Sequence, residues 1–221
     1  MMHIVVLLSG NGSNLQAILD HIEHHHLAVK IKAVISNDAT AFGLERAKKA
    51  HIPTLICDHR LYPKRTDFDA ALLAMITPLA PDFIVLAGFM RILSSYFIKQ
   101  YPDKILNIHP SLLPAYRGMH THERVLEAHE KEHGVSVHFV NSALDDGPII
   151  AQAKLRIRSD DTADSLQKRI LKLEHQLYPL VLRWLDAEEI VYHLEEGVVY
   201  CRGSALPSSG LLVPLSINDE D

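Results

Sequence analysis

Short apolar runs rich in β-branched residues alternate along the first half of the chain with stretches of helical periodicity. The runs over 3–8, 31–36 and 83–87 predict buried strands, and the stretches over 15–24 and 67–79 predict amphipathic helices. Apolar strands separated by helices are typical of a parallel sheet that is covered on both faces. We therefore predict an α/β fold with an open, mostly parallel, Rossmann-like sheet and helices on both faces.

The second half of the chain continues this pattern and then departs from it. A further buried strand is expected over 105–108, and the segments 135–140 and 149–157 predict a pair of strands. The residues that join this pair, NSALDDGP, are dense in turn formers and too many for a tight hairpin, so we expect a functional loop. A long helix is predicted over 162–187, and Pro179 should kink or split it.

Length and composition fit one globular domain. The chain has 221 residues, of which 48% are hydrophobic and 22% are charged, and these values are typical of soluble globular proteins. We expect a single domain over 1–202. The tail over 203–221 has no periodicity and ends in acidic residues, so we expect it to be poorly ordered.

Charge and hydropathy narrow the classes of partner. A formal net charge of -5 argues against a surface that binds long nucleic acids. No apolar run approaches the ~20 residues of a membrane-spanning helix, and the first residues lack the basic start of a signal peptide. Two cysteines suit a reducing cytoplasm. We expect a cytoplasmic monomer or homodimer that binds small molecules, and neither nucleic acid nor membrane.

The glycine-rich segment SGNGSN, residues 9–14, lies between the first predicted strand and the first predicted helix. Backbone N–H groups and the helix dipole favour an anion at such a place, and Ser13 or Asn14 is expected near the N-cap. The segment lacks the third glycine of a dinucleotide-binding fingerprint and the Gly-Lys of a P-loop. Two interpretations stay open, a phosphate site or a turn that merely joins strand to helix.

The chain contains 15 histidines, which raises the question of a metal site. The segment from His129 to His133, HEKEH, formally matches the HExxH zinc signature, but it is entirely polar and stops at Gly134. We interpret it as an exposed helix end. His120 and His122 have the spacing of metal ligands but lack a third partner in the sequence, so we predict no metal.

The segment NIHPSLLP carries the most informative pair of side chains. Asn107 and His109 are two residues apart at the end of an apolar strand, so both can point to one side. Ligands bind at the carboxyl ends of strands in open α/β sheets. Asn can stabilise an oxyanion and His can transfer a proton near neutral pH. A carboxylate from Asp145 in the later loop would favour the imidazolium if it lay beside His109.

Five segments together carry a resemblance to a known family, namely SGNGSNLQA, AGFMRIL, NIHPSLLP, HGVSVHFV and LDDGPII. In this order and spacing the chain resembles the folate-dependent phosphoribosylglycinamide formyltransferases over roughly residues 1–200. HPSLLP and DxGP are shared across the wider group of formyltransferases, and they indicate the type of reaction. SGNGSNLQ and the HTH at 120–122 are similar to the purine branch.

The resemblance implies formyl transfer from 10-formyltetrahydrofolate, as co-substrate, to the amine of 5-phosphoribosylglycinamide in purine (IMP) biosynthesis, without a metal. It implies catalytic roles for Asn107, His109 and Asp145. It implies contacts to the phosphoribosylglycinamide from Gly12, Ser13, Asn14 and Glu174. It implies a folate site along Arg65, Met90, Arg91, Ile92, Leu93 and Asn107.

Two positions depart from the family pattern. Leu171 stands where some members have a polar or basic residue, so one phosphate contact is expected to be absent. Arg117 in AYRG is similar to the branch of the family that acts on tRNA, which bears on the specificity of that loop.

Three alternative functions fit the sequence less well. Methionyl-tRNA formyltransferase shares the chemistry, but it carries an added C-terminal domain and binds a polyanion, whereas this chain is short and acidic. Formyltetrahydrofolate deformylase typically has an N-terminal regulatory domain, whereas here the first strand begins at His3. A non-catalytic nucleotide-binding module would leave Asn107, His109 and Asp145 unexplained.

Overall fold

The apolar runs of the first half form five parallel strands in the computed structural model, which describes residues 1–217. They belong to a compact unit made of residues 1–107 and 140–142, and the last of them carries the chain on into a second unit. The strands lie side by side in the order β3-β2-β1-β4-β5. Their bounds are β1 (Met2–Leu8), β2 (Val29–Ser36), β3 (Thr54–Ile56), β4 (Phe83–Leu86) and β5 (Ile105–His109).

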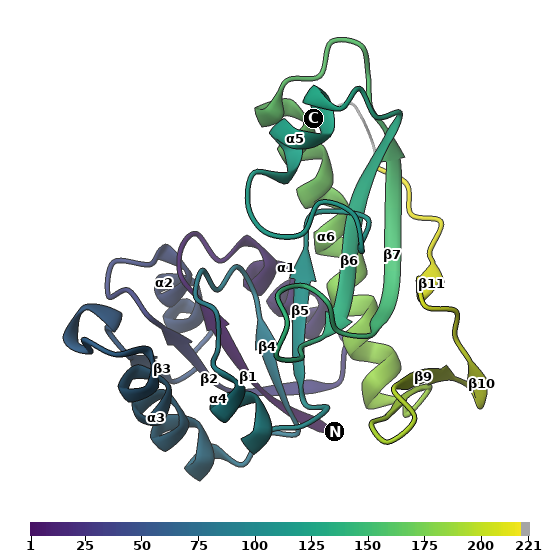
Figure 1. Ribbon diagram of the computed structural model, residues 1–221. Helices are drawn as coiled ribbons and strands as arrows, with labels where there is room; N and C mark the ends of the chain where they lie inside the picture. Colours follow the sequence, from purple (N-terminus) through teal and green to yellow (C-terminus); the bar gives the residue numbers. More distant parts are fainter. Residues whose placement is uncertain (218–221) are drawn as a thin grey trace. The chain divides into compact units, whose positions relative to one another are not determined.

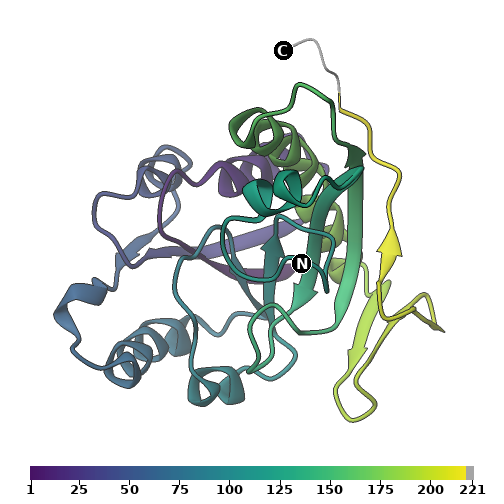
Figure 2. The same cartoon turned by 45° about the horizontal axis from the view of Figure 1, so that its top comes forward.

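Helices cover both faces of this sheet, as Figures 1 and 2 show. Alternation along β1 explains the two layers, because Val5 and Leu7 pack in a core with Phe68 of α3 while Leu8 contacts Gly43 of α2. The α-helices are α1 (Ser13–Glu23), α2 (Phe42–Lys49), α3 (Arg65–Ile76) and α4 (Ser95–Gln100), and the 3-10 helices are η1 (His59–Leu61) and η2 (Thr77–Leu79).

The second unit comprises residues 108–139 and, within the described part of the chain, residues 143–217. Two long antiparallel strands, β6 (Glu132–Phe139) and β7 (Ile149–Arg156), pack against α6 (Ala163–Asp186). A short helix, α5 (Thr121–Glu127), precedes β6. A small antiparallel sheet follows α6 and contains β8 (Ile190–His193), β9 (Val198–Cys201) and β10 (Ser204–Ala205).

The predicted fold class, a mostly parallel α/β sheet with helices on both faces, is confirmed. The predicted split of the long helix is not observed, because α6 is continuous over 24 residues with Pro179 inside it. Proline removes one backbone donor from the helix. The neighbouring side chains of Leu177, Tyr178, Val181 and Leu182 are fully buried, and this packing keeps the helix whole.

The segment 203–217 contains two short strands, β10 and β11 (Leu211–Leu212), and β11 pairs in parallel with β7. The expectation of a poorly ordered tail also covers residues 218–221, which lie outside the described part of the chain. Over residues 1–217, no helix has both the length and the apolar character needed to cross a bilayer.

Candidate functional site

His109 ends β5 and is held between two oxygen acceptors of the second unit. Its side chain is buried, with Nε2 at 3.0 Å from the carbonyl oxygen of Tyr116. Its Nδ1 lies 3.4 Å from Oδ2 of Asp145. A carbonyl and a carboxylate can only accept hydrogen bonds, so both ring nitrogens of His109 face acceptors.

Asp145 connects His109 with the backbone of a neighbouring loop. Its backbone has φ of 48°, in the left-handed region that Asp adopts more readily than most residues. Oδ2, the oxygen nearest to His109, accepts a hydrogen bond from the N–H of Gly118 at 2.9 Å. The structure therefore brings together His109 and Asp145, as the sequence predicts, and adds Gly118 as a second partner of the carboxylate.

His138 of β6 is a further histidine at this site, and the motifs of the sequence do not predict a role for it. Its Nε2 lies 3.9 Å from Oδ1 of Asp145, and its Nδ1 lies 2.8 Å from the carbonyl oxygen of Phe139. Burial lowers the pKa of His138, so it presents a neutral ring to the carboxylate. Alternation within HGVSVHFV offers the one available signal, because Ser136 and His138 are polar at every second position of a buried strand.

Asn107 lies two residues before His109 in β5, where it pairs with Leu86 of β4. Alternation along one strand directs the side chains of Asn107 and His109 to the same side. Asn107 is half-buried. The expectation that the amide lies near the imidazole rests on this alternation of the strand.

The SGNGSN turn joins β1 to α1, and Gly12 occupies the N-cap with φ of 73°. Ser13 and Asn14 lie directly after the N-cap, near it as expected, but α1 begins at Ser13 and no side chain caps the helix. Glycine is required here, since a Cβ at Gly12 would lie 2.6 Å from Cα of Gly43. The first turn of α1 contains no acidic residue. This helix start is therefore electrostatically suited to an anion.

The segment 90–93 follows β4 and is fastened to two other parts of the first unit. The N–H of Met90 donates to Oγ of Ser9 at 2.8 Å, and Nη1 of Arg65 donates to the carbonyl oxygen of Ile92 at 3.5 Å. The side chain of Leu93 is buried in the core. The side chains of Met90 and Ile92 are exposed, by 74% and 55% respectively, so this segment presents apolar groups and backbone to solvent.

Arg91 and Glu174 occupy quite different surroundings. The guanidinium of Arg91 lies 4.8 Å from the ring centre of Phe68, in a cation–π contact within the first unit. Glu174 lies on α6 in the second unit, where its side chain is buried. Leu171 is half-buried on the same helix.

The HEKEH segment is not helical, and its prediction as an exposed helix end is wrong. α5 ends at Glu127, and His129 lies in a turn with φ of 54°. His133 is buried in β6, where its Nε2 lies 3.0 Å from Nδ1 of His122. The two ends of HEKEH therefore do not share a helix face, as the zinc signature requires. Within residues 1–217 no group of three or more potential ligands could hold a metal ion.

We expect His122 and His133 to make the free energy of unfolding depend on pH. Burial lowers the pKa of His122 and lowers that of His133 from 6.5 to about 3. In the unfolded chain His133 is protonated as the pH falls below 6.5, whereas in the folded chain it stays neutral until about pH 3. The free energy of unfolding should fall as the pH drops from 6.5 towards 3, by up to about 1.4 kcal/mol per pH unit from His133.

Urea unfolding at several pH values between 5 and 8 measures this effect. His133→Gln keeps a hydrogen-bonding group but cannot titrate, so its unfolding free energy should depend less on pH than that of the parent chain. His26→Gln, at an exposed position, is the matched control and should keep the parent slope. An unchanged slope in His133→Gln would contradict the assignment.

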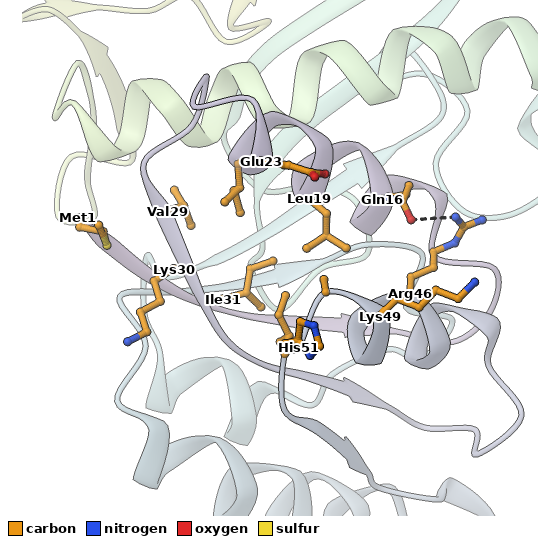
Figure 3. Close-up of a pocket in the computed structure, with 13 residues that line it drawn as sticks. Met1, Gln16, Leu19, Glu23, Val29, Lys30, Ile31, Arg46, Lys49 and His51 are labelled. Carbon is orange, nitrogen blue, oxygen red and sulfur yellow. Dashed lines mark hydrogen bonds between the residues drawn. The ribbon is translucent and has the colours of Figure 1, made fainter.

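A separate cavity of about 680 Å³ lies in the first unit, between α1, β2 and α2 (Figure 3). Leu19 and Ile31 contribute to its apolar lining. At one end Arg46 donates to Oε1 of Gln16 and to Oδ1 of Asn11, each at 3.0 Å. Arg46 thus connects the cavity wall with the SGNGSN turn. None of the predicted site residues lines this cavity.

Comparison with known proteins identifies the family. The family described as formyl transferase matches residues 2–182. The chain is 47% identical over 209 residues to phosphoribosylglycinamide formyltransferase of Escherichia coli strain K12, covering 95% of this chain and 98% of that protein. It is 42% identical over 180 residues to the human trifunctional purine biosynthetic protein adenosine-3, covering 81% of this chain and 18% of that protein.

A solved structure agrees with these relatives. The structure of phosphoribosylglycinamide formyltransferase from Coxiella burnetii, in complex with CHES, has a TM-score of 0.92 to this chain and is 51% identical to it. The match covers 96% of this chain and 99% of that one. The resemblance seen in the sequence motifs is thereby confirmed, and the chain belongs to the formyl transferase family.

Proposed function

We propose that this chain transfers the formyl group of 10-formyltetrahydrofolate to the amine of 5-phosphoribosylglycinamide in purine biosynthesis. The observation that carries the proposal is the contact of His109 with Asp145, 3.4 Å apart at the end of β5. An imidazole oriented by a carboxylate is suited to proton transfer during attack by an amine. The 47% identity to the E. coli phosphoribosylglycinamide formyltransferase supports this acceptor among those that a formyl transferase can use.

Three residues divide the chemistry among them in this proposal. When the amine attacks the formyl carbon, negative charge grows on the formyl oxygen, and Asn107 and protonated His109 stabilise it. His109 mediates the proton transfer from the attacking amine to the folate nitrogen that leaves. Asp145 keeps the imidazole oriented and charged. A new C–N bond to the ribonucleotide replaces the bond to the folate, so no covalent enzyme intermediate and no metal is needed.

Gly12, Ser13 and Asn14 hold the phosphate of the ribonucleotide in this proposal. Support comes from the glycine N-cap and the absence of acidic residues in the first turn of α1. Glu174, whose side chain is buried on α6, contacts the same substrate in this proposal.

The folate lies along Arg65, Met90, Arg91, Ile92, Leu93 and Asn107 in this proposal. 10-Formyltetrahydrofolate supplies the activated formyl group. The residues of the 90–93 segment fit a flat heteroaromatic group, because they combine exposed apolar side chains with backbone groups held by Ser9 and Arg65. Leu93 contributes through its backbone, because its side chain is buried in the core.

The proposal also covers the cellular location, the partners and the oligomeric state of the chain. We infer that it acts in the cytoplasm on small molecules, as a monomer or homodimer, without nucleic acid or membrane. The net charge of -5 supports the choice of a small acceptor over tRNA.

An acceptor assay tests the proposal. The purified chain is incubated with 10-formyltetrahydrofolate and either phosphoribosylglycinamide, methionyl-tRNA or water alone, and the products are followed by mass spectrometry. We expect formylated ribonucleotide and one equivalent of tetrahydrofolate. Formylation of methionyl-tRNA alone, or release of formate without an acceptor, would assign the chain to another reaction of the family.

A further inference from the structure

An ion pair next to Asp145 joins two loops of the second unit. The 115–120 loop follows the HPSLLP segment, and the 143–147 loop precedes β7. The guanidinium of Arg117 forms an ion pair with the carboxylate of Asp146. The adjacent residue of each loop makes a second link, from the N–H of Gly118 to Oδ2 of Asp145 at 2.9 Å. Two consecutive residues of one loop thus contact two consecutive residues of the other.

The 115–120 loop is shaped so that these links act together. Nη1 of Arg124 donates to the carbonyl oxygens of Arg117 and Met119, at 2.7 and 3.3 Å, which fixes the backbone on both sides of Gly118. The carbonyl oxygen of Tyr116 contacts Nε2 of His109. Arg117 is followed directly by Gly118. A movement of the Arg117 backbone therefore also moves the N–H of Gly118, which donates its hydrogen bond to Asp145.

Charge gives the ion pair a second effect. Asp145 and Asp146 are neighbours in the sequence, and their two negative charges repel each other. Arg117 offsets the charge of Asp146 and leaves Asp145 to interact with His109. Both side chains of the pair are about two-fifths exposed, 41% and 42%, so its direct contribution to folding stability is small. Any larger role has to come from the position that it imposes on Asp145.

We propose that Arg117 and Asp146 are positioning residues of the formyl transfer reaction, which hold the 115–120 loop so that Asp145 faces His109. This inference rests on the proposed function. The ion pair does not contact the reacting atoms. It keeps the N–H of Gly118 on Asp145, and thereby restrains the carboxylate that orients the imidazole.

A double-mutant cycle with a conservative rescue tests the inference. Arg117→Ala and Asp146→Ala should each lower kcat about twofold to fivefold, with little change in KM, and the double variant should lose no more than either one. Arg117→Lys keeps the charge and should recover most of the activity. Arg117→Glu places a third negative charge beside the pair of aspartates and should lower kcat about tenfold or more.

Lys154→Ala is the matched control, because it breaks a similarly exposed ion pair, with Glu132, elsewhere in the same unit. It should leave kcat unchanged. Additive losses, or no recovery in Arg117→Lys, would overturn the inference.

Amide hydrogen exchange separates this inference from the proposed function, because it needs no substrate. The N–H of Gly118 should exchange faster in Arg117→Ala than in the parent chain, and at the parent rate in Lys154→Ala. Unchanged exchange in Arg117→Ala would overturn the inference even if the parent chain formylates phosphoribosylglycinamide. A parent chain without that activity would instead refute the proposed function.

Discussion

Replacing His109 with alanine will lower kcat by about a hundredfold to ten-thousandfold, the range that general acid–base catalysis contributes. The proposed role of His109 is to transfer a proton and to stabilise charge in the transition state, so KM for both substrates should change little. Steady-state kinetics with the ribonucleotide and the folate measure both constants. His129→Ala, in an exposed turn of the same unit, is the control and should retain full turnover.

Asp145→Asn should cause a loss of similar size. Asparagine has nearly the same shape as aspartate and also tolerates the left-handed backbone at φ of 48°, so the loop should keep its conformation. The amide removes the negative charge 3.4 Å from Nδ1 of His109. Because the two groups act as one unit, the double variant should lose little more than either single one. Near-normal turnover in a folded single variant would remove these residues from the mechanism.

The parts of this site that the sequence predicts depend on local geometry. Alternation along 105–109 is enough to place Asn107 and His109 on one side of a strand end. The carboxylate of Asp145 could be assigned because it lies in a loop dense in turn formers and because the LDDGPII motif resembles a known family. The sheet of the first unit was predictable for the same kind of reason, since buried strands and amphipathic helices differ in their periods.

The parts that the sequence does not predict depend on contacts between distant residues. HEKEH is polar and looks exposed, yet His133 is buried as the second residue of β6, where it contacts His122. The N-cap of α1 depends on the close approach of Gly43 to Gly12, which no local preference of Ser or Asn can reveal. The ion pair of Arg117 with Asp146 forms only in the folded chain, so the sequence gives no sign of it. In each case a tertiary partner overrides the local pattern.

Removing the phosphate from the acceptor should lower kcat/KM by about a hundredfold or more, because several charge-assisted hydrogen bonds of roughly 1.5 to 3 kcal/mol each are lost. KM for the folate should hardly change. Gly12→Val is a poor probe of this site, since a side chain at Gly12 would collide with the backbone of Gly43 and disturb folding.

Ser13→Asp tests the phosphate site without that difficulty. An acidic residue in the first turn of a helix stabilises the helix through its dipole, so the variant should fold at least as well as the parent chain. The same carboxylate repels a phosphate dianion, so kcat/KM for the phosphorylated acceptor should fall strongly, while the low activity on the acceptor without phosphate should persist. Ser95→Asp makes the same chemical change at the start of α4 and should leave both activities unchanged. If Ser13→Asp instead formylates the phosphorylated acceptor at the parent rate, the phosphate binds elsewhere and the SGNGSN turn only joins β1 to α1.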